Sequence, residues 1–259
     1  MAADFWASYQ SKQLLSVEEV SRVAEEDLEL GLTLQDTRLI KIAMTTYMRD
    51  LAQQAKLRQR VVATAVCYMR RMYVSKSLCE YDPRLVAPAC LYLASKAEES
   101  VAQAKLLVFY AKKLKPGPEN GAYQLEVKDL LDMELRVLEA LDFRLVVYHP
   151  YRAAVQYLND AKLTDVMQTT WSLLNDVYRT DLPLLHPPHV VALGCIHLAA
   201  FLKDRDAKPW LEDLKADMHA VRAVQMELLD HYEQYANIDP ALTAAAMAKL
   251  PIRTRAART

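Results

Sequence analysis

The segment DPRLVAPACLYLASKAEE, residues 82–99, has the pattern of a buried helix. Asp82 can accept hydrogen bonds from the free N–H groups of a helix start, and Pro83 suits the first helical position. Apolar residues then recur three and four positions apart, so one side of the helix is apolar. Several of these residues are alanines, which let neighbouring helices approach closely. The segment therefore predicts the central helix of an all-α domain.

The same pattern occurs a second time in the chain. A shift of 105 positions places residues 83–99 on residues 188–204 without a gap, with identical residues at Pro83/Pro188, Val86/Val191, Ala87/Ala192, Cys90/Cys195, Leu93/Leu198 and Ala94/Ala199. Identities on one register indicate a duplicated helical unit. The alternative is a chance match between two unrelated alanine-rich helices.

Two residues of the first copy have no equivalent in the second. Lys96 aligns with Phe201, which we expect to be an ordinary core residue, and Glu134 aligns with His219. A lysine is almost never fully buried unless it is paired. Lys96 and Glu134 are therefore candidates for a binding function, and the alternative is an internal salt bridge that joins two helices.

Composition limits the class of protein. The 259 residues include only four glycines and are 53% hydrophobic, which favours long helices around a substantial core. The net charge of −1 argues against direct nucleic-acid binding, and the chain lacks a long uncharged apolar run, so we expect no membrane span. The first residues do not form a secretory signal, which favours an intracellular protein.

The chain divides into four predicted parts. We expect an N-terminal arm and helix at 1–34, a first repeat at 35–147, a second repeat at 148–238, and a C-terminal helix with a basic tail at 239–259. A capping-box pattern from Ser16 to Glu19 predicts one helix that runs to about Glu29. The arm carries Phe5 and Trp6, which can dock on the protein's own surface or on a partner.

Catalytic and metal-binding signals are weak. The sequence contains no P-loop, glycine-rich dinucleotide turn, nucleophile elbow or HExxH motif. His186 and His189 flank two prolines, but further ligands with suitable spacing are missing. We therefore expect no metal, no cofactor and no catalytic residues, and helical repeats of this kind favour a binding scaffold over an enzyme.

Several longer runs resemble the cyclin family across nearly the whole chain, and most closely the C-type cyclins of the Mediator kinase module. They are Phe5-Trp6, LRQRVVATA at 57–65, the segment at 82–99, VYHPYR at 147–152 and NDVYRTDLPLLHPP at 175–188. The resemblance implies two tandem five-helix cyclin boxes with an N-terminal helix and a short C-terminal helix. It also implies a non-catalytic subunit that activates a cyclin-dependent kinase in the nucleus and regulates RNA polymerase II transcription.

The resemblance also implies which residues bind. In the family, a lysine and a glutamate that match Lys96 and Glu134 bond the kinase backbone beside its mobile αC helix. The Phe5-Trp6 run belongs to the same kinase-binding set. Glu98 and Glu99 should lie near the kinase activation segment, where Glu99 can order arginines as a phosphate does in other kinases.

A second surface is implied for the second box. Trp171, Asn175 and Asp176 share one helical face, and with Tyr232 they match a groove that faces a large Mediator subunit in C-type cyclins. The alternative for Trp171 is an ordinary core position.

Two other functions compete with this interpretation. Another transcription-type cyclin differs least in sequence pattern from the C type. A transcription factor of the IIB type would also have two such repeats, but it should carry a zinc ribbon and a basic second repeat. A helical scaffold without a kinase is a further alternative, which a kinase-binding measurement would separate from the cyclins.

Overall fold

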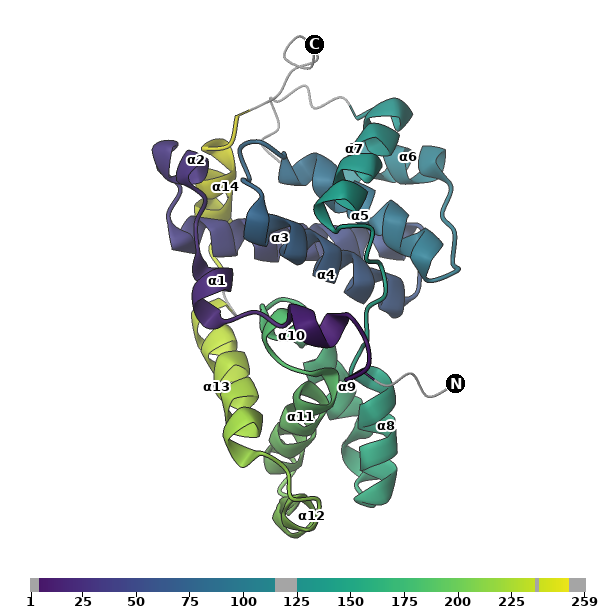
Figure 1. Ribbon diagram of the computed structural model, residues 1–259, viewed down its shortest axis with the longest axis vertical. Coiled ribbons are helices and arrows are strands. Elements are labelled where there is room, and N and C mark those ends of the chain that lie inside the picture. The colour runs from purple at the N-terminus through teal and green to yellow at the C-terminus, as the bar shows by residue number, and fades with distance from the viewer. Residues whose placement is uncertain (1–4, 115–124, 236–237, 252–259) are drawn as a thin grey trace. The chain divides into compact units, whose positions relative to one another are not determined.

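The computed structural model describes residues 5–114, 125–235 and 238–251. These residues form helices joined by loops, and none of them lies in a β-strand, as the predicted all-α fold requires (Figure 1). The predicted loop PGPENG at 116–121 and the basic segment IRTRAART at 252–259 lie outside the described residues. No helix in the described ranges is long and apolar enough to cross a membrane.

The chain forms two compact units. The first unit consists of residues 17–146 and 238–259, and the second unit of residues 1–16 and 147–237. The C-terminal helix therefore belongs with the first unit, and the N-terminal arm belongs with the second.

Five helices make up the centre of the first unit: α3 (Leu34–Gln54), α4 (Gln59–Ser75), α5 (Pro83–Ala97), α6 (Ala104–Leu114) and α7 (Val127–Ala140). The predicted central helix is α5, which packs against the other four. Its start is as predicted, because the Asp82 side chain accepts a hydrogen bond from the Arg84 backbone N–H at 3.0 Å. Val86, Ala87 and Cys90 are fully buried, so the small residues allow close packing around α5.

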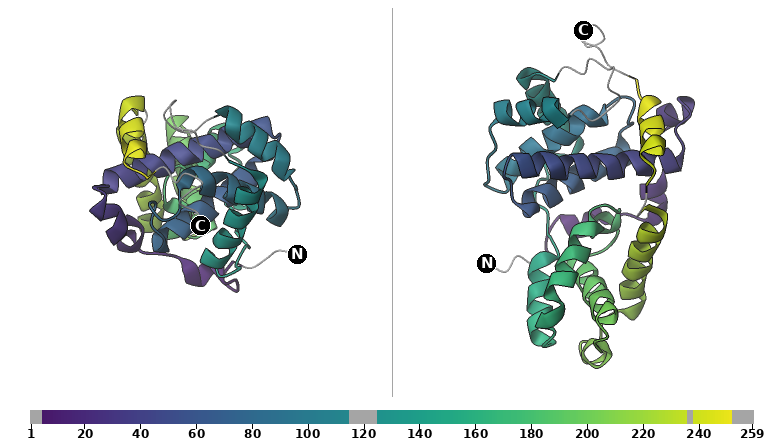
Figure 2. Two further views of the ribbon diagram at one scale, coloured as in Figure 1. Left: turned by 90° about the horizontal axis from the view of Figure 1, so that it is seen from above. Right: turned by 180° about the vertical axis from the view of Figure 1, so that it is seen from behind.

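The first unit is completed by helices at its two ends: α1 (Val17–Ser21), α2 (Glu25–Glu29) and α14 (Pro240–Ala248). Helix α14 lies against α3 (Figure 2). An ion pair of 2.8 Å between Lys249 Nζ and Asp36 Oδ2 ties the end of α14 to the start of α3. Asp36 also belongs to the capping box with Thr33 that starts α3, as the sequence predicts.

The single helix predicted from Ser16 to Glu29 is wrong, because α1 and α2 are separate. Asp27 on α2 is only 3% exposed. Its carboxylate accepts hydrogen bonds from the Ser77 hydroxyl at 2.8 Å and from the backbone N–H groups of Leu78 and Cys79 at 3.0 Å each. These bonds fix α2 to the loop before α5, so tertiary contacts of Asp27 override the local helical pattern.

The second unit has a corresponding set of helices: α8 (Tyr151–Asp160), η2 (Thr164–Val166), α9 (Met167–Val177), α10 (Leu182–Leu185), α11 (Pro188–Leu202), α12 (Lys208–Asp213) and α13 (Met218–Tyr235). The bounds of α11 follow those of α5 at the shift of 105 residues. Both helices end in the same motif, with Glu99 at φ 52° and Asp204 at φ 51°. The repeated end geometry agrees with a duplication.

One position in α11 requires a glycine. A Cβ atom at Gly194 would lie 2.6 Å from Val224 Cγ1 on α13. The aligned residue in α5 is Ala89, which is fully buried. Helices α11 and α13 therefore approach each other more closely than a side chain at position 194 would allow.

Two details of the repeat alignment are wrong. Phe201 is 74% exposed rather than a core residue. The buried residues Leu130 and Val137 of α7 match Val221 and Leu228 of α13 at a shift of 91 residues, counted from the helix starts. Glu134 therefore corresponds to Gln225 and not to His219, and its counterpart is still not acidic.

The N-terminal arm packs on the second unit and includes η1 (Gln10–Gln13). The buried Gln10 side chain accepts a hydrogen bond from the Tyr148 backbone N–H at 2.6 Å. The Leu15 N–H donates to the Leu184 carbonyl at 2.9 Å. These backbone contacts fix the arm, so it docks on the protein's own surface.

Candidate functional site

The structure brings Lys96 and Glu134 into direct contact. Lys96 near the end of α5 places its Nζ 2.7 Å from Oε1 and 2.9 Å from Oε2 of Glu134, on α7. The two side chains differ in exposure, at 41% for Lys96 and 8% for Glu134. The internal salt bridge foreseen for these residues therefore exists, and its ammonium end faces solvent.

The surroundings of Lys96 favour its charged form. Its Nζ also lies 4.3 Å from the centre of the Tyr92 ring, within the range of a cation–π contact. Partial burial lowers the pKa of Lys96, but the hydrogen bond and the charge of Glu134 outweigh this effect, and the pKa is raised overall. An ammonium has three N–H donors and a carboxylate has about four acceptor positions, so the pair retains capacity to bond another backbone.

Glu98 and Glu99 follow Lys96 but differ in their contacts. Glu98 accepts a hydrogen bond from the Thr64 hydroxyl at 2.7 Å, and its Oε2 lies 2.6 Å from Arg60 Nε. Glu99 is exposed and occupies the left-handed position after the helix. Glu98 therefore joins α5 to α4, whereas Glu99 presents its carboxylate to solvent.

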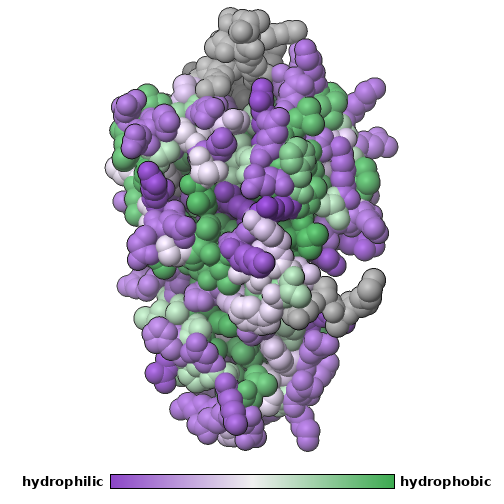
Figure 3. Space-filling model, viewed as in Figure 1, coloured by the Kyte–Doolittle hydropathy of each residue, from purple (hydrophilic) through white to green (hydrophobic). Residues whose placement is uncertain are grey.

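Exposed apolar side chains accompany this site, and the sequence analysis did not identify them. Leu131 and Leu135 are 39% and 59% exposed, and helical geometry places both within about 100° of Glu134 around α7. Phe109 on α6 is 61% exposed. Figure 3 shows such hydrophobic side chains among charged ones on the face that includes α7. The available signal was an excess of leucines in α7, more than one buried stripe can use.

The second predicted group also comes together. Trp171 packs its ring against the Tyr151 ring, with 5.0 Å between centroids, and the Tyr151 hydroxyl donates to Asn175 Oδ1 at 3.0 Å. The Tyr232 hydroxyl donates to Asp176 Oδ2 at 2.8 Å. Burial and this hydrogen bond raise the pKa of Tyr232.

Trp171 is 38% exposed, so it is not an ordinary core residue. The group therefore offers an aromatic surface with polar atoms that α8, α9 and α13 hold in fixed positions.

The aromatic residues of the arm pack on the second unit. The Phe5 ring meets the Tyr148 ring edge-on at 5.8 Å between centroids, and the Trp6 ring lies 5.7 Å from the His189 ring. Trp6 remains 61% exposed. The arm thus displays a large apolar side chain on a fixed backbone.

Comparison with solved structures defines the class of fold. The chain matches one from the CAK complex of Chaetomium thermophilum bound to ATP-γ-S, with a TM-score of 0.76 and 16% identity, covering 95% of this chain and 87% of the other. It also matches a viral cyclin from herpesvirus saimiri, with a TM-score of 0.61 and 16% identity, covering 86% of this chain and 100% of the other. The fold is that of the cyclins.

Sequence comparison defines the family. Residues 7–146 match the family described as the cyclin N-terminal domain. Cyclin-C1-1 of Oryza sativa subsp. japonica is 55% identical over 93% of this chain and 92% of its own length, and Cyclin-C of Rattus norvegicus is 36% identical over 97% and 91%. Cyclin-C1-1 of Arabidopsis thaliana is 51% identical over 98% and 100%. The chain belongs to the cyclin family, and its similarity to relatives named cyclin C extends over nearly its whole length.

Proposed function

We propose that this chain is the non-catalytic, regulatory subunit of a cyclin-dependent kinase of the Mediator kinase module. In this role it acts in the nucleus and regulates transcription by RNA polymerase II. The similarity to plant and animal relatives named cyclin C supports the proposal. A chain from the yeast RNA polymerase II CTD kinase CTDK-1 shares the fold, with a TM-score of 0.70 and 18% identity over 92% of this chain and 81% of the other.

The observation that carries the proposal is the ion pair between Lys96 and Glu134. It lies between α5 and α7, is open to solvent at its ammonium, and stands beside the exposed side chains of Leu131 and Leu135. On binding, the Lys96 ammonium donates to a backbone carbonyl of the kinase, and the Glu134 carboxylate accepts from a backbone N–H. The apolar side chains bury against the same kinase element.

Such contacts can activate the kinase without chemistry in this chain. A kinase needs its αC glutamate paired with the ATP-binding lysine before phosphoryl transfer. A partner that binds the αC helix only in that position shifts the kinase toward its active state, because it stabilises one of two conformations. Glu99 extends toward the activation segment and orders arginines there, while Glu98 supports it through the bonds to Thr64 and Arg60.

Two further surfaces complete the proposal. Phe5 and Trp6 add kinase contacts from the arm. Trp171, Asn175, Asp176 and Tyr232 form the surface for a large subunit of the Mediator kinase module, where the aromatic rings supply apolar area and the carboxylate and amide supply acceptors.

The test is the affinity for the Mediator-type kinase after substitution of both members of the ion pair. Lys96→Ala with Glu134→Ala should weaken binding roughly 30-fold or more, as for a central interface pair. The matched control is Arg136→Ala with Glu139→Ala, an exposed ion pair of 3.4 Å on another side of α7. Unchanged affinity of the first variant, with its far-UV circular dichroism intact, would leave the pair as an internal contact only.

A further inference from the structure

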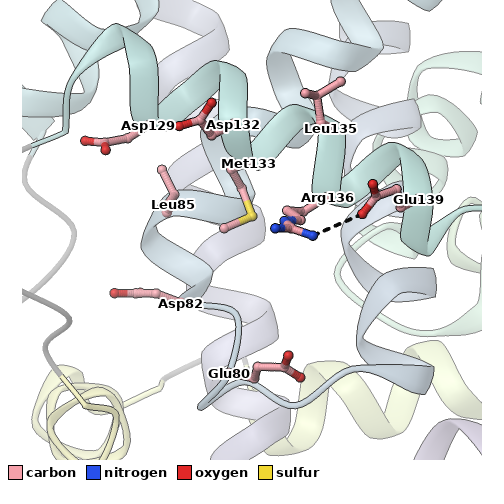
Figure 4. Close-up of a pocket in the computed structure, with 9 residues that line it drawn as sticks. All are labelled: Glu80, Asp82, Leu85, Asp129, Asp132, Met133, Leu135, Arg136 and Glu139. Carbon is pink, nitrogen blue, oxygen red and sulfur yellow. Dashed lines mark hydrogen bonds and ion pairs between the residues drawn. The ribbon is translucent and has the colours of Figure 1, made fainter. Parts of the chain in front are cut away.

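The first unit contains a groove that the proposed kinase contacts do not use. Its volume is about 470 Å³. Its walls are the loop before α5, the first turn of α5 and one side of α7 (Figure 4). The lining residues are Glu80, Asp82, Leu85, Asp129, Asp132, Met133, Leu135, Arg136 and Glu139. Asp132 and Arg136 are each about 200° from Glu134 around α7, so the centre of the groove faces away from the ion pair with Lys96.

The groove is acidic around an apolar floor. Five carboxylates and one guanidinium line it, and Leu85 and Met133 lie between them. Arg136 pairs with Glu139 at 3.4 Å. No hydrogen bond or ion pair joins the side chains of Glu80 or Asp132 to another described residue. The groove thus suits a segment that carries several positive charges and some apolar surface.

The chain itself leads to this groove. Arg84 holds Asp82 with two hydrogen bonds of 2.8 Å, and its Nη2 also donates to the carbonyl of Pro251 at 3.3 Å. Pro251 is the last described residue, so the backbone reaches a lining residue of the groove at that point. The next eight residues, IRTRAART, contain Arg253, Arg255 and Arg258 and no acidic residue.

We propose that residues 252–259 of this chain occupy the acidic groove. With Arg84 included, the groove has five carboxylates and two guanidiniums, a formal charge of −3, and the three arginines of the segment match it. Guanidinium groups bond carboxylates through two parallel N–H···O contacts, which favours arginine over lysine here. Eight extended residues span at most about 26–29 Å, so the segment can reach along the groove from Pro251.

The experiment compares trypsin cleavage after the three arginines in full-length chains, followed by mass spectrometry of the intact protein. Glu80→Gln with Asp132→Asn removes two charges of the groove. The matched control, Glu212→Gln with Asp213→Asn, removes two exposed charges of α12 in the second unit. At low salt the groove variant should lose its segment about three to ten times faster than the wild type and the control. At about 0.5 M salt all three rates should agree.

A second measurement identifies the occupant. A labelled peptide with the sequence IRTRAART should bind the full-length variant Arg253→Gln, Arg255→Gln, Arg258→Gln more tightly than the wild type, whose own segment competes. Equal binding to both chains would mean that the groove takes basic segments from other molecules, and the proposal would be wrong. Equal cleavage rates for the groove variant and the wild type at low salt would also overturn it.

Discussion

Substitution of Lys96 and of Glu134 one at a time should destabilise the protein unequally. Lys96→Met removes the ammonium but keeps an unbranched stem beside Tyr92. It leaves the Glu134 side chain, only 8% exposed, without its counter-charge. Stranding a buried charged acceptor costs about 1–3 kcal/mol. Glu134→Gln leaves an ammonium that is 41% exposed and therefore hydrated, so we expect a loss of about 0.5–1 kcal/mol.

Urea unfolding followed by far-UV circular dichroism measures this difference. The free energy of unfolding should fall more for Lys96→Met than for Glu134→Gln, and the double variant should cost less than the sum of the two. Arg136→Met and Glu139→Gln, from an ion pair that is exposed at both ends, should each change stability by less than about 0.5 kcal/mol. Equal losses for the two members of the buried pair would refute the argument from exposure.

The same pair gives a dependence on pH. The pKa of Lys96 is raised above its ordinary value of 10.5, so its contribution to stability is complete below that pH and is lost as the pH rises through the folded-state pKa. The difference in unfolding free energy between the wild type and Lys96→Met should be constant from neutral pH to about pH 9 and should vanish at strongly alkaline pH. A difference that persists after the ammonium is neutralised would contradict the ion-pair explanation.

Two further predictions concern packing and activation. Gly194→Ala should destabilise the second unit by about 1–3 kcal/mol, because the new methyl group meets Val224, and Val224→Ala in the same chain should recover part of the loss in thermal unfolding. Glu99→Gln should lower the kcat of the bound kinase in a peptide phosphorylation assay while affinity stays the same; an equal kcat for both proteins would remove Glu99 from the activation mechanism.

Local signals predicted the main helices well. The Asp82 cap and the Thr33–Asp36 capping box form as their sequence patterns indicate. The internal repeat correctly placed α11 at residues 188–202, since both central helices must bury small residues among several neighbours. Helix α10 was missed because its four residues lie in a proline-rich stretch that favours a loop.

Contacts between distant segments could not be predicted. The separation of α1 and α2 depends on Asp27, whose carboxylate bonds backbone groups about fifty residues away. The exposure of Phe201 depends on which neighbours end before the last turn of α11. Periodicity cannot reveal either feature, because it describes a helix without the elements that pack on it.

The candidate site was partly predictable for the same reason. Comparison of the two copies identified Lys96 and Glu134 as residues that the fold does not require. Their mutual contact was one of the two possibilities considered, but the asymmetry of exposure emerges only from the packing of α5 on α7. The exposed leucines beside Glu134 and the acidic groove depend on three-dimensional neighbours, so the sequence pattern alone did not indicate them.

The central claim is that this cyclin binds a kinase of the Mediator kinase module. The most direct measurement is the affinity of the purified full-length chain for that kinase and, in parallel, for a cell-cycle kinase. We predict tight binding to the first and at least about a hundredfold weaker binding to the second, a difference of roughly 2.7 kcal/mol. Binding to neither kinase, or equal binding to both, would contradict the account.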